Sequence, residues 1–187
     1  MIEDIQKSLE VLKRGGVILL PTDTHWSLGC DATNGEAVDR LLKIKKREPG
    51  KRLLLLMENP ALLDRYVAEV PEIAWDLAEI STTPLTMVFS NPRNLPDILT
   101  ASDGTIGIRF TREDFSKELI QRFRRPVLAS SANFSGGKSP SVFLDVDDNI
   151  RTAVDYIVEF RQDDLTPAVS SSIIRLGSGG RIEIIRE

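Results

Sequence analysis

Hydrophobic residues recur every three or four positions in several stretches of the chain, which is the spacing of one face of an α-helix. The first stretch covers residues 2–14 and is followed by Gly15 and Gly16, a typical C-terminal stop. The same spacing predicts further helices at residues 36–46, 62–68, 71–80 and 113–123. The chain therefore alternates helical segments with other structure.

Short uninterrupted apolar runs lie between these segments and are typical of buried strands. The first run, Val17–Leu20, ends at Pro21 and leads into a polar Pro-Thr-Asp-Thr stretch. Other runs predict strands at residues 53–57, 86–89, 106–110, 127–129, 156–160, 172–176 and 182–185. The irregular alternation predicts an α/β (α+β) fold with a single twisted, mixed open sheet flanked by helices. Since no repeat or linker interrupts the pattern, residues 1–187 are expected to form a single domain.

Composition limits the kind of chemistry. The 187 residues include 24 Lys and Arg against 28 Asp and Glu. This balance excludes a protein that coats nucleic acid through an overall positive charge, so any anion site must be local. With one cysteine, Cys30, and one histidine, His25, the chain can form neither an internal disulfide nor a Cys/His zinc site. The polar start and the absence of a long apolar run predict a soluble, cytoplasmic protein without a membrane segment.

The densest basic cluster is KIKKREPGKR, residues 43–52, with six Lys or Arg and one Glu. Lys45 and Arg47 at a helix end, with Lys51 beyond a turn, could converge on a polyanion, because Arg offers a planar fork to phosphate oxygens and Lys a mobile charge. The alternative is a solvated helix end whose cations complement the helix dipole.

A second polar concentration, residues 130–141, follows the predicted strand at 127–129. Ser131, Asn133 and Ser139 can donate hydrogen bonds to phosphate from such a strand end, although an ordinary glycine-serine loop would look the same. Neither GxxxxGK[ST] nor GxGxxG is present, so a nucleotide site would have to be built differently. His25 is interpreted as a structural or rim residue, since no second histidine accompanies it.

Several separated motifs together resemble one family. They are Gly16 to Thr24 with Leu28-Gly29, Ile44-Lys45-Lys46-Arg47 with Lys51, Pro84-Leu85-Thr86, Gly107-Ile108-Arg109, Ser131-Ala132-Asn133 with Ser135-Gly136, and Ser171-Ser172-Ile173. In this order and spacing the chain resembles the YrdC/Sua5 family of threonylcarbamoyl-AMP synthases along nearly its whole length.

The resemblance implies a YrdC-like fold with a concave basic cavity, and a nucleotidyltransferase activity. L-threonine, bicarbonate and ATP would give threonylcarbamoyl-adenylate and pyrophosphate for N6-threonylcarbamoyladenosine in tRNA, so tRNA and the threonylcarbamoyl-transfer proteins are indirect partners. It also implies the residue roles. ATP would contact Arg47, Lys51, Thr105, Ser131, Ser139 and Arg186, threonine would contact Thr24, Arg109 and Ser171, and the catalytic signature would be Lys45, Arg47, Ser131 and Asn133.

This reaction suits a chain with a single histidine. The carbamate formed from threonine and bicarbonate is itself the nucleophile, so the protein has to supply orientation and positive charge. Mg²⁺ is expected to accompany ATP, held by the phosphates, with no protein residue assigned as a metal ligand.

The main departure from the family pattern is His25-Trp26-Ser27, where Val-Tyr-Gly is usual. It supports one alternative, a YrdC-like paralogue with a different carbamoyl or amino-acid substrate. A second alternative is a non-catalytic protein that binds double-stranded RNA through residues 43–52. The chain ends at Glu187, which predicts a short, single-domain member of the family.

Overall fold

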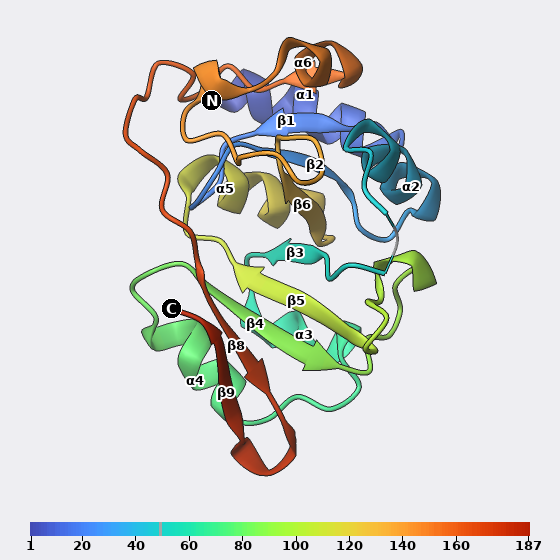
Figure 1. The fold of residues 1–187 in the computed structure, drawn as a ribbon, viewed down its shortest axis with the longest axis vertical. Coiled ribbons are helices and arrows are strands. Elements are labelled where there is room, and N and C mark those ends of the chain that lie inside the picture. The colour runs from blue at the N-terminus through green and yellow to red at the C-terminus, as the bar shows by residue number, and fades with distance from the viewer. Residues whose placement is uncertain (49) are drawn as a thin grey trace.

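The computed structural model describes residues 1–48 and 50–187, and one nine-stranded sheet organises them (Figure 1). The strands are β1 (Ile18–Leu20), β2 (Ser27–Asp31), β3 (Leu54–Met57), β4 (Leu85–Ser90), β5 (Thr105–Phe110), β6 (Val127–Ser131), β7 (Tyr156–Ile157), β8 (Ser172–Leu176) and β9 (Ile182–Arg186). Their order is β7-β1-β2-β6-β3-β5-β4-β8-β9. The pairs β1/β7, β3/β5 and β4/β8 are parallel and the others antiparallel, which confirms the predicted mixed open sheet.

The predicted helices are confirmed, with ends shifted by one or two residues in most cases. The α-helices are α1 (Ile2–Lys13), α2 (Gly35–Ile44), α3 (Leu63–Tyr66), α4 (Ile73–Ile80), α5 (Asp114–Phe123) and α6 (Asp148–Ala153), and the 3₁₀ turns are η1 (Pro60–Leu62), η2 (Asp97–Leu99), η3 (Phe143–Asp145) and η4 (Ser178–Gly180). The helix predicted at 62–68 is shorter, because Val67 leaves helical geometry and pairs with Pro92 in an isolated β-bridge.

Strand β2 was not predicted, because its sequence Ser-Leu-Gly-Cys-Asp lacks an apolar run. All five residues are nevertheless buried, since β2 pairs on both sides with β1 and β6. A Cβ atom on Gly29 would stand 2.8 Å from Leu20 Cδ2, so a larger residue here would have to displace the buried Leu20 side chain. The polar end is accommodated because the buried carboxylate of Asp31 receives a hydrogen bond from Arg125 at 2.8 Å.

Two other elements differ from the prediction. The strand predicted at 156–160 ends at Ile157, because the backbone N–H of Glu159 donates to the Asp4 carboxylate at 2.8 Å instead of continuing the ladder. Helix α6 was missed because it is short and buries a single residue, Ile150, so its hydrophobic pattern is weak.

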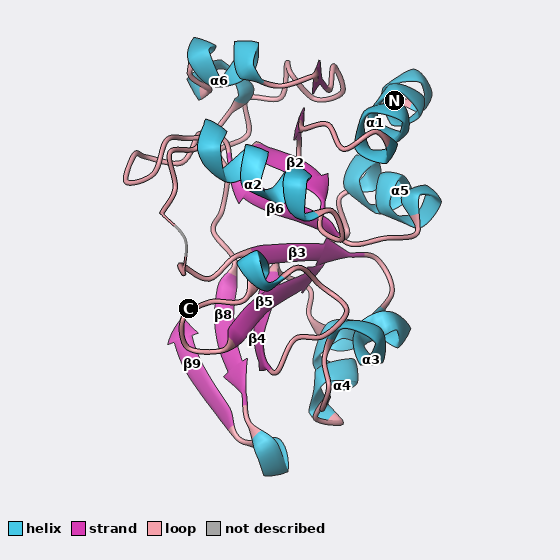
Figure 2. Ribbon diagram, turned by 90° about the vertical axis from the view of Figure 1, so that its right-hand side faces the viewer, coloured by secondary structure: helices cyan, strands magenta, loops and turns pink. Residues whose placement is uncertain are grey.

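The core lies on both faces of the sheet (Figure 2). Helices α1 and α5 pack on one face, against Ile18, Leu56 and Val127. Helices α2, α3, α4 and α6 contribute to the cluster on the other face, which includes Leu55 and Leu128. The alternation of β3 residues between the two clusters follows from the two-residue period of a strand.

The face covered by α1 and α5 is open at its other end. There, Leu54, Gly107 and Ala129 from the neighbouring strands β3, β5 and β6 lie at the same level of the sheet and line a cavity. The segment from residue 158 to 171, which connects β7 to β8, crosses beside this open region (Figure 1). Within residues 1–48 and 50–187, no helix combines the length and the hydropathy that a bilayer crossing requires.

Candidate active site

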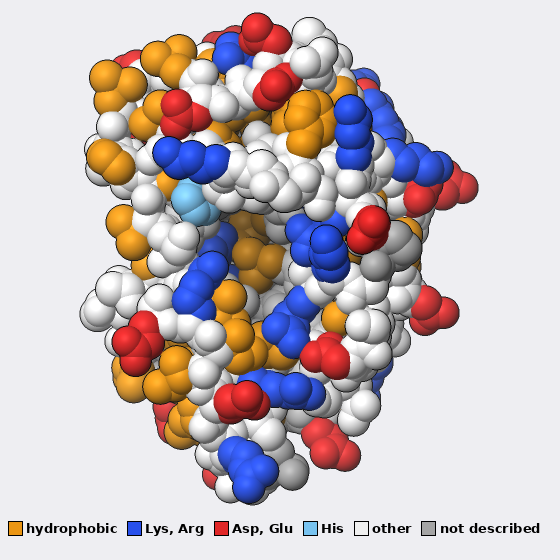
Figure 3. Space-filling view, in the orientation of Figure 1, with side chains coloured by type: hydrophobic (Ala, Val, Ile, Leu, Met, Phe, Trp, Pro, Cys, Tyr) orange, Lys and Arg blue, Asp and Glu red, His pale blue; other side chains and the backbone are white. Residues whose placement is uncertain are grey.

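The open end of the sheet holds a cavity of about 300 Å³. Figure 3 shows it as a hollow with hydrophobic side chains at its base and Lys and Arg side chains around it. Polar and charged side chains come to it from segments far apart in the sequence: Thr24, His25, Ser27, Arg47, Arg52, Thr86, Arg109, Ser130, Ser131, Ser139, Ser170, Ser171 and Arg186. The fold therefore joins the Pro-Thr-Asp-Thr stretch, the basic cluster and the 130–141 loop at one place.

Four arginines line this cavity, and three of them carry charge that no carboxylate among the described residues compensates, whereas the fourth, Arg52, pairs with Asp103 at 2.8 Å. Arg47, Arg109 and Arg186 line it, and in the part of the chain that the structure describes none of them forms an ion pair with a carboxylate. No Asp or Glu is found among the described residues of the wall. Because uncompensated cations attract anions strongly in a partly desolvated site, this cavity is suited to an anionic ligand.

Arg109 is the most buried of the three, with 3% of its surface exposed. Its Nη1 donates to Thr24 Oγ1 at 3.1 Å, and its Nε has no partner among the described residues. Burial lowers the pKa of Arg109 to about 10, an effect opposed by Asp23 and reinforced by Arg186. Arg109 is therefore a charged group with donor capacity left for a ligand.

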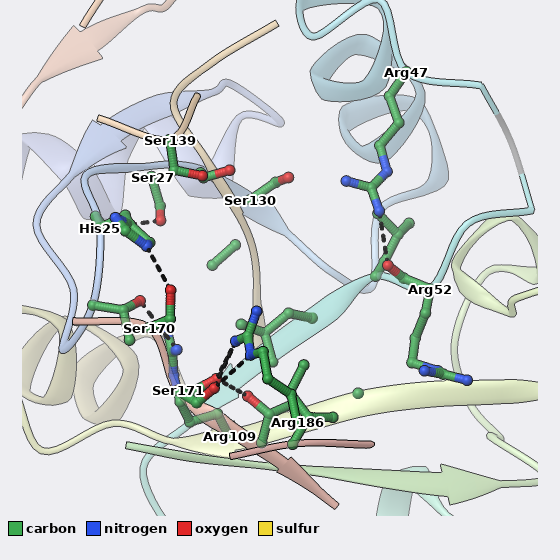
Figure 4. Close-up of a pocket in the computed structure, with 18 residues that line it drawn as sticks. His25, Ser27, Arg47, Arg52, Arg109, Ser130, Ser139, Ser170, Ser171 and Arg186 are labelled. Carbon is green, nitrogen blue, oxygen red and sulfur yellow. Dashed lines mark hydrogen bonds between the residues drawn. The ribbon is translucent and has the colours of Figure 1, made fainter. Parts of the chain in front are cut away.

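Arg47 stands on the opposite side of the cavity from Arg109 and Arg186 (Figure 4). Its Nη2 donates to the carbonyl oxygen of Arg52 at 2.9 Å, which fixes the guanidinium, while its Nε has no partner among the described residues. Burial lowers the pKa of Arg47. The two sides thus present separate cationic positions, an arrangement suited to a ligand with more than one anionic group.

A cluster of hydroxyl groups accompanies Arg109 and Arg186. The buried hydroxyls of Thr86 and Ser171 share a hydrogen bond at 2.9 Å, and Arg186 donates to the Ser171 carbonyl through Nε at 3.0 Å and Nη2 at 2.6 Å (Figure 4). Since Thr24 accepts from Arg109, the three residues predicted to hold threonine, Thr24, Arg109 and Ser171, lie in one contiguous group.

Lys45 lies beneath the 130–141 loop and outside the cavity wall. Its side chain is 1% exposed, and its ammonium donates to the carbonyl oxygens of Ser131 and, at 2.7 Å, Asn133. Burial, with a smaller contribution from Arg47, lowers the pKa of Lys45 to about 8. The observed contacts make Lys45 a support for the loop that carries Ser131 and Ser139.

Three other predicted site residues also lie off the wall. The side-chain amide of Asn133 bonds within its own loop, donating to the carbonyl oxygens of Phe134 and Gly137 at 2.8 Å each. Thr105 is fully buried and donates to Asp103 at 2.5 Å. Lys51 is exposed, and its Nζ lies 3.9 Å from Glu48 Oε2. Their roles toward ATP remain predictions.

Sequence reasoning assigned no role toward ATP or threonine to several residues of the wall. Arg52 reaches it from the basic cluster, held by Asp103 and Thr105 at 2.8 and 2.9 Å. Ser170 reaches it beside Ser171, and His25 lies between them and the 130–141 loop. Only proximity in sequence to predicted residues could have suggested Arg52 and Ser170.

The fold and the cavity define an α/β protein with an arginine-lined cavity, suited to an anionic ligand, on the open face of a mixed sheet. Residues 10–187 match the family model Sua5/YciO/YrdC, described as telomere recombination. The chain belongs to this family.

Relatives in the family carry a common name. The chain is 34% identical over 158 residues to a threonylcarbamoyl-AMP synthase of Pseudoalteromonas translucida, covering 83% of this chain and 84% of the relative. It is 35% identical over 137 residues to the same synthase of Coxiella burnetii, covering 72% and 73%.

Solved structures agree with this relationship. Sua5 of P. abyssi, solved in complex with L-threonine, aligns at 26% identity with a TM-score of 0.82, covering 92% of this chain and 50% of that one. The present chain thus spans about half the length of that Sua5 chain. YciO of E. coli aligns with a TM-score of 0.83 at 23% identity, covering 98% and 88%, and shares the fold.

Proposed function

We propose that this protein is a threonylcarbamoyl-AMP synthase, which forms threonylcarbamoyl-adenylate and pyrophosphate from L-threonine, bicarbonate and ATP. The observation that carries the proposal is the set of arginines, Arg47, Arg109 and Arg186, that face one cavity without carboxylate partners among the described residues. The family membership and the names of the relatives support the choice of substrates.

The threonine substrate is assigned to the side of the cavity with Thr24, Arg109 and Ser171. The Arg109 guanidinium would bind the carboxylate of the amino acid, because Arg is the natural partner of a carboxylate. The buried hydroxyls around it, which already exchange hydrogen bonds, would orient the rest of the molecule.

The phosphates of ATP are assigned to Arg47 together with Ser131 and Ser139 of the 130–141 loop, which line the same cavity. A carbamate oxygen would attack the α-phosphorus and displace pyrophosphate. The negative charge on the transferring phosphorus group would be stabilised by Arg47 and the loop donors. Lys45 would act from below by fixing the loop through the carbonyls of Ser131 and Asn133.

The cavity wall does not fit a protein-bound Mg²⁺ ion. Mg²⁺ is usually held by one or two carboxylates together with phosphates, and the described wall residues include no Asp or Glu. No group of three or more His, Cys, Asp or Glu side chains suited to a metal occurs elsewhere in the described part of the chain. Mg²⁺ would therefore arrive as a ligand of ATP, and no step of the mechanism is assigned to it.

The proposal is tested by measuring pyrophosphate release from ATP with each amino acid, with and without bicarbonate. Release that requires both threonine and bicarbonate supports the synthase. Release with another amino acid would support the related enzyme suggested by His25 and Ser27, which replace the usual residues and lie on the wall. No release, together with salt-sensitive retention of double-stranded RNA, would support the RNA-binding alternative.

A further inference from the structure

The single histidine joins two loops at the cavity wall. His25 Nδ1 lies 3.2 Å from the carbonyl oxygen of Pro140. Its Nε2 lies 3.4 Å from Ser170 Oγ, a contact drawn in Figure 4. The backbone carbonyl of His25 is itself fixed by the hydroxyls of Thr22 and Ser27, at 2.8 and 3.0 Å. The imidazole is therefore held between the 130–141 loop and the segment 158–171.

These contacts define which ring nitrogen carries the proton. A carbonyl oxygen can only accept, so Nδ1 must be the donor to Pro140. In the neutral ring Nε2 is then an acceptor, and the hydroxyl hydrogen of Ser170 points to it. The lone pairs of Ser170 Oγ are left to accept a hydrogen bond from a ligand in the cavity.

The charges in the cavity orient an amino acid toward this hydroxyl. On the proposed function, the carboxylate lies against Arg109. The ammonium group of the same molecule is repelled by Arg109 and Arg186, and it needs oxygen acceptors. Ser170 is next in sequence to Ser171 in the predicted threonine site, and both line the cavity. If the ammonium group donates a hydrogen bond to Ser170 Oγ, it gains an oxygen acceptor and points away from the two arginines.

We propose that Ser170 and His25 take up the proton that the ammonium group must lose before its nitrogen can react. The ammonium N–H proton passes to Ser170 Oγ as the Ser170 hydroxyl proton passes to His25 Nε2, which leaves a neutral amine and an imidazolium. The amine lone pair then forms the N–C bond to bicarbonate, a C–O bond breaks, and the departing hydroxide leaves as water with an amine proton. The imidazolium returns its proton to solvent. His25 acts through Ser170 and is a positioning residue.

The remaining charged groups near the pair do not supply another proton acceptor. Both carboxylate oxygens of Asp23 accept hydrogen bonds, from Thr111 Oγ1 and from the backbone of residues 112 and 113. Asp164, on the segment that carries Ser170, pairs with Arg161 at 2.8 Å. The other charged groups on the described wall or on the loops that His25 joins are Arg47, Arg52, Arg109, Lys138, Glu159, Asp163 and Arg186. The two carboxylates among them, Glu159 and Asp163, do not line the cavity. Histidine is the residue type whose charge changes between about pH 5 and pH 8.

The test is the pH dependence of kcat/KM for threonine, from pyrophosphate release at saturating ATP and bicarbonate. The variants are Ser170→Ala, His25→Gln and His25→Asn. The asparagine retains a donor for the Pro140 carbonyl. Ser90→Ala, an exposed serine outside this cavity, is the matched control. At about pH 7 we expect kcat/KM of both His25 variants to fall by about 100-fold. The deficit should shrink as pH rises, because the substrate amine then loses its proton without help. Added imidazole should restore part of the rate.

Three outcomes would overturn the relay. A rate reduced by the same factor at every pH would mean that His25 only ties the two loops together. An unchanged profile in His25→Gln would mean that the ring takes no part. If the unmodified protein released no pyrophosphate with threonine, the proposed function would fail and the relay with it. Circular dichroism and melting temperature, measured on each variant, separate a folding defect from all three.

Discussion

Replacing Arg109 with methionine is expected to stabilise the fold while removing threonine-dependent turnover. The guanidinium is 3% exposed and has no ion-pair partner within the described residues, so the folded state carries a buried charge that the unfolded chain exposes to water. Methionine retains most of the aliphatic volume and removes the charge. The activity should disappear because the substrate carboxylate loses its partner.

The size of the effect follows from the pKa. Burial lowers the pKa of Arg109 from an ordinary value of 12.5 to about 10. Each pKa unit corresponds to about 1.4 kcal/mol, so keeping this group charged at neutral pH costs about 3 kcal/mol. The variant also loses the 3.1 Å hydrogen bond to Thr24 Oγ1, worth about 1 to 2 kcal/mol. We therefore expect the unfolding free energy to rise by about 1 to 2 kcal/mol. For a chain of this size each kcal/mol raises Tm by about 2 to 4 °C.

The assay is urea denaturation of the protein and of Arg109→Met at pH 7, with pyrophosphate release measured on the same samples. Arg122→Met is the matched control, because Arg122 lies at the surface end of α5 in an exposed pair with Glu118. Its stability should change by no more than about 0.5 kcal/mol. If Arg109→Met unfolds more easily than the unmodified protein by more than about 1 kcal/mol, the charge is compensated in the fold, and the reasoning is refuted.

Three further predictions concern neighbouring features. Arg47→Ala should raise the Kd for ATP at least about tenfold with little loss of stability, since the one contact given for the Arg47 side chain is its hydrogen bond to the Arg52 carbonyl; calorimetric ATP titration measures this Kd. Between pH 8 and 10.5 the unfolded chain binds a proton at Lys45 that the native state lacks, because burial lowers that pKa to about 8 from 10.5. Stability should therefore rise over this interval, and Lys45→Met should remove that part of the slope in urea unfolding. Asn34→Ala removes the carbonyl acceptor that caps α2 at 3.1 and 3.2 Å; it should lower the unfolding free energy by about 1 kcal/mol and leave pyrophosphate release unchanged.

The sequence predicted most elements of the fold because their signals are local. Among the described residues, apolar runs and helical spacing identify eight of the nine strands and five of the six α-helices, since each pattern lies within a few consecutive residues. Strand β2 escaped because burial on both sides replaces an apolar pattern there, with Gly29 admitting Leu20 and Asp31 held by Arg125. These contacts join residues far apart in the chain, so no local window contains them.

Some residues of the candidate site could likewise be predicted from local sequence and others could not. Residues at strand ends, such as Arg109 and Ser131, could be expected to face the cavity, because the strands carry them to its edge. The position of Lys45 depends on where the 130–141 loop folds, and the sequence alone could not separate a ligand contact from a contact to the backbone. Ser170 depends on the path of the segment 158–171, which has no periodic pattern.

The lack of partners at the cavity is not caused by a shortage of acidic residues. The chain has 28 Asp and Glu for 24 Lys and Arg, and cations outside the cavity do find carboxylates, as Arg125 does with Asp31 at 2.8 Å. Lys45 and Arg109, the two buried cations of the described chain, form no ion pair. Lys45 bonds to loop carbonyls off the wall, whereas Arg109 lines the cavity, so a ligand carboxylate that binds there can return the stability lost by burying this unpaired charge. L-threonine, whose carboxylate is assigned to Arg109, should therefore raise the melting temperature more in the unmodified protein than in Arg109→Met.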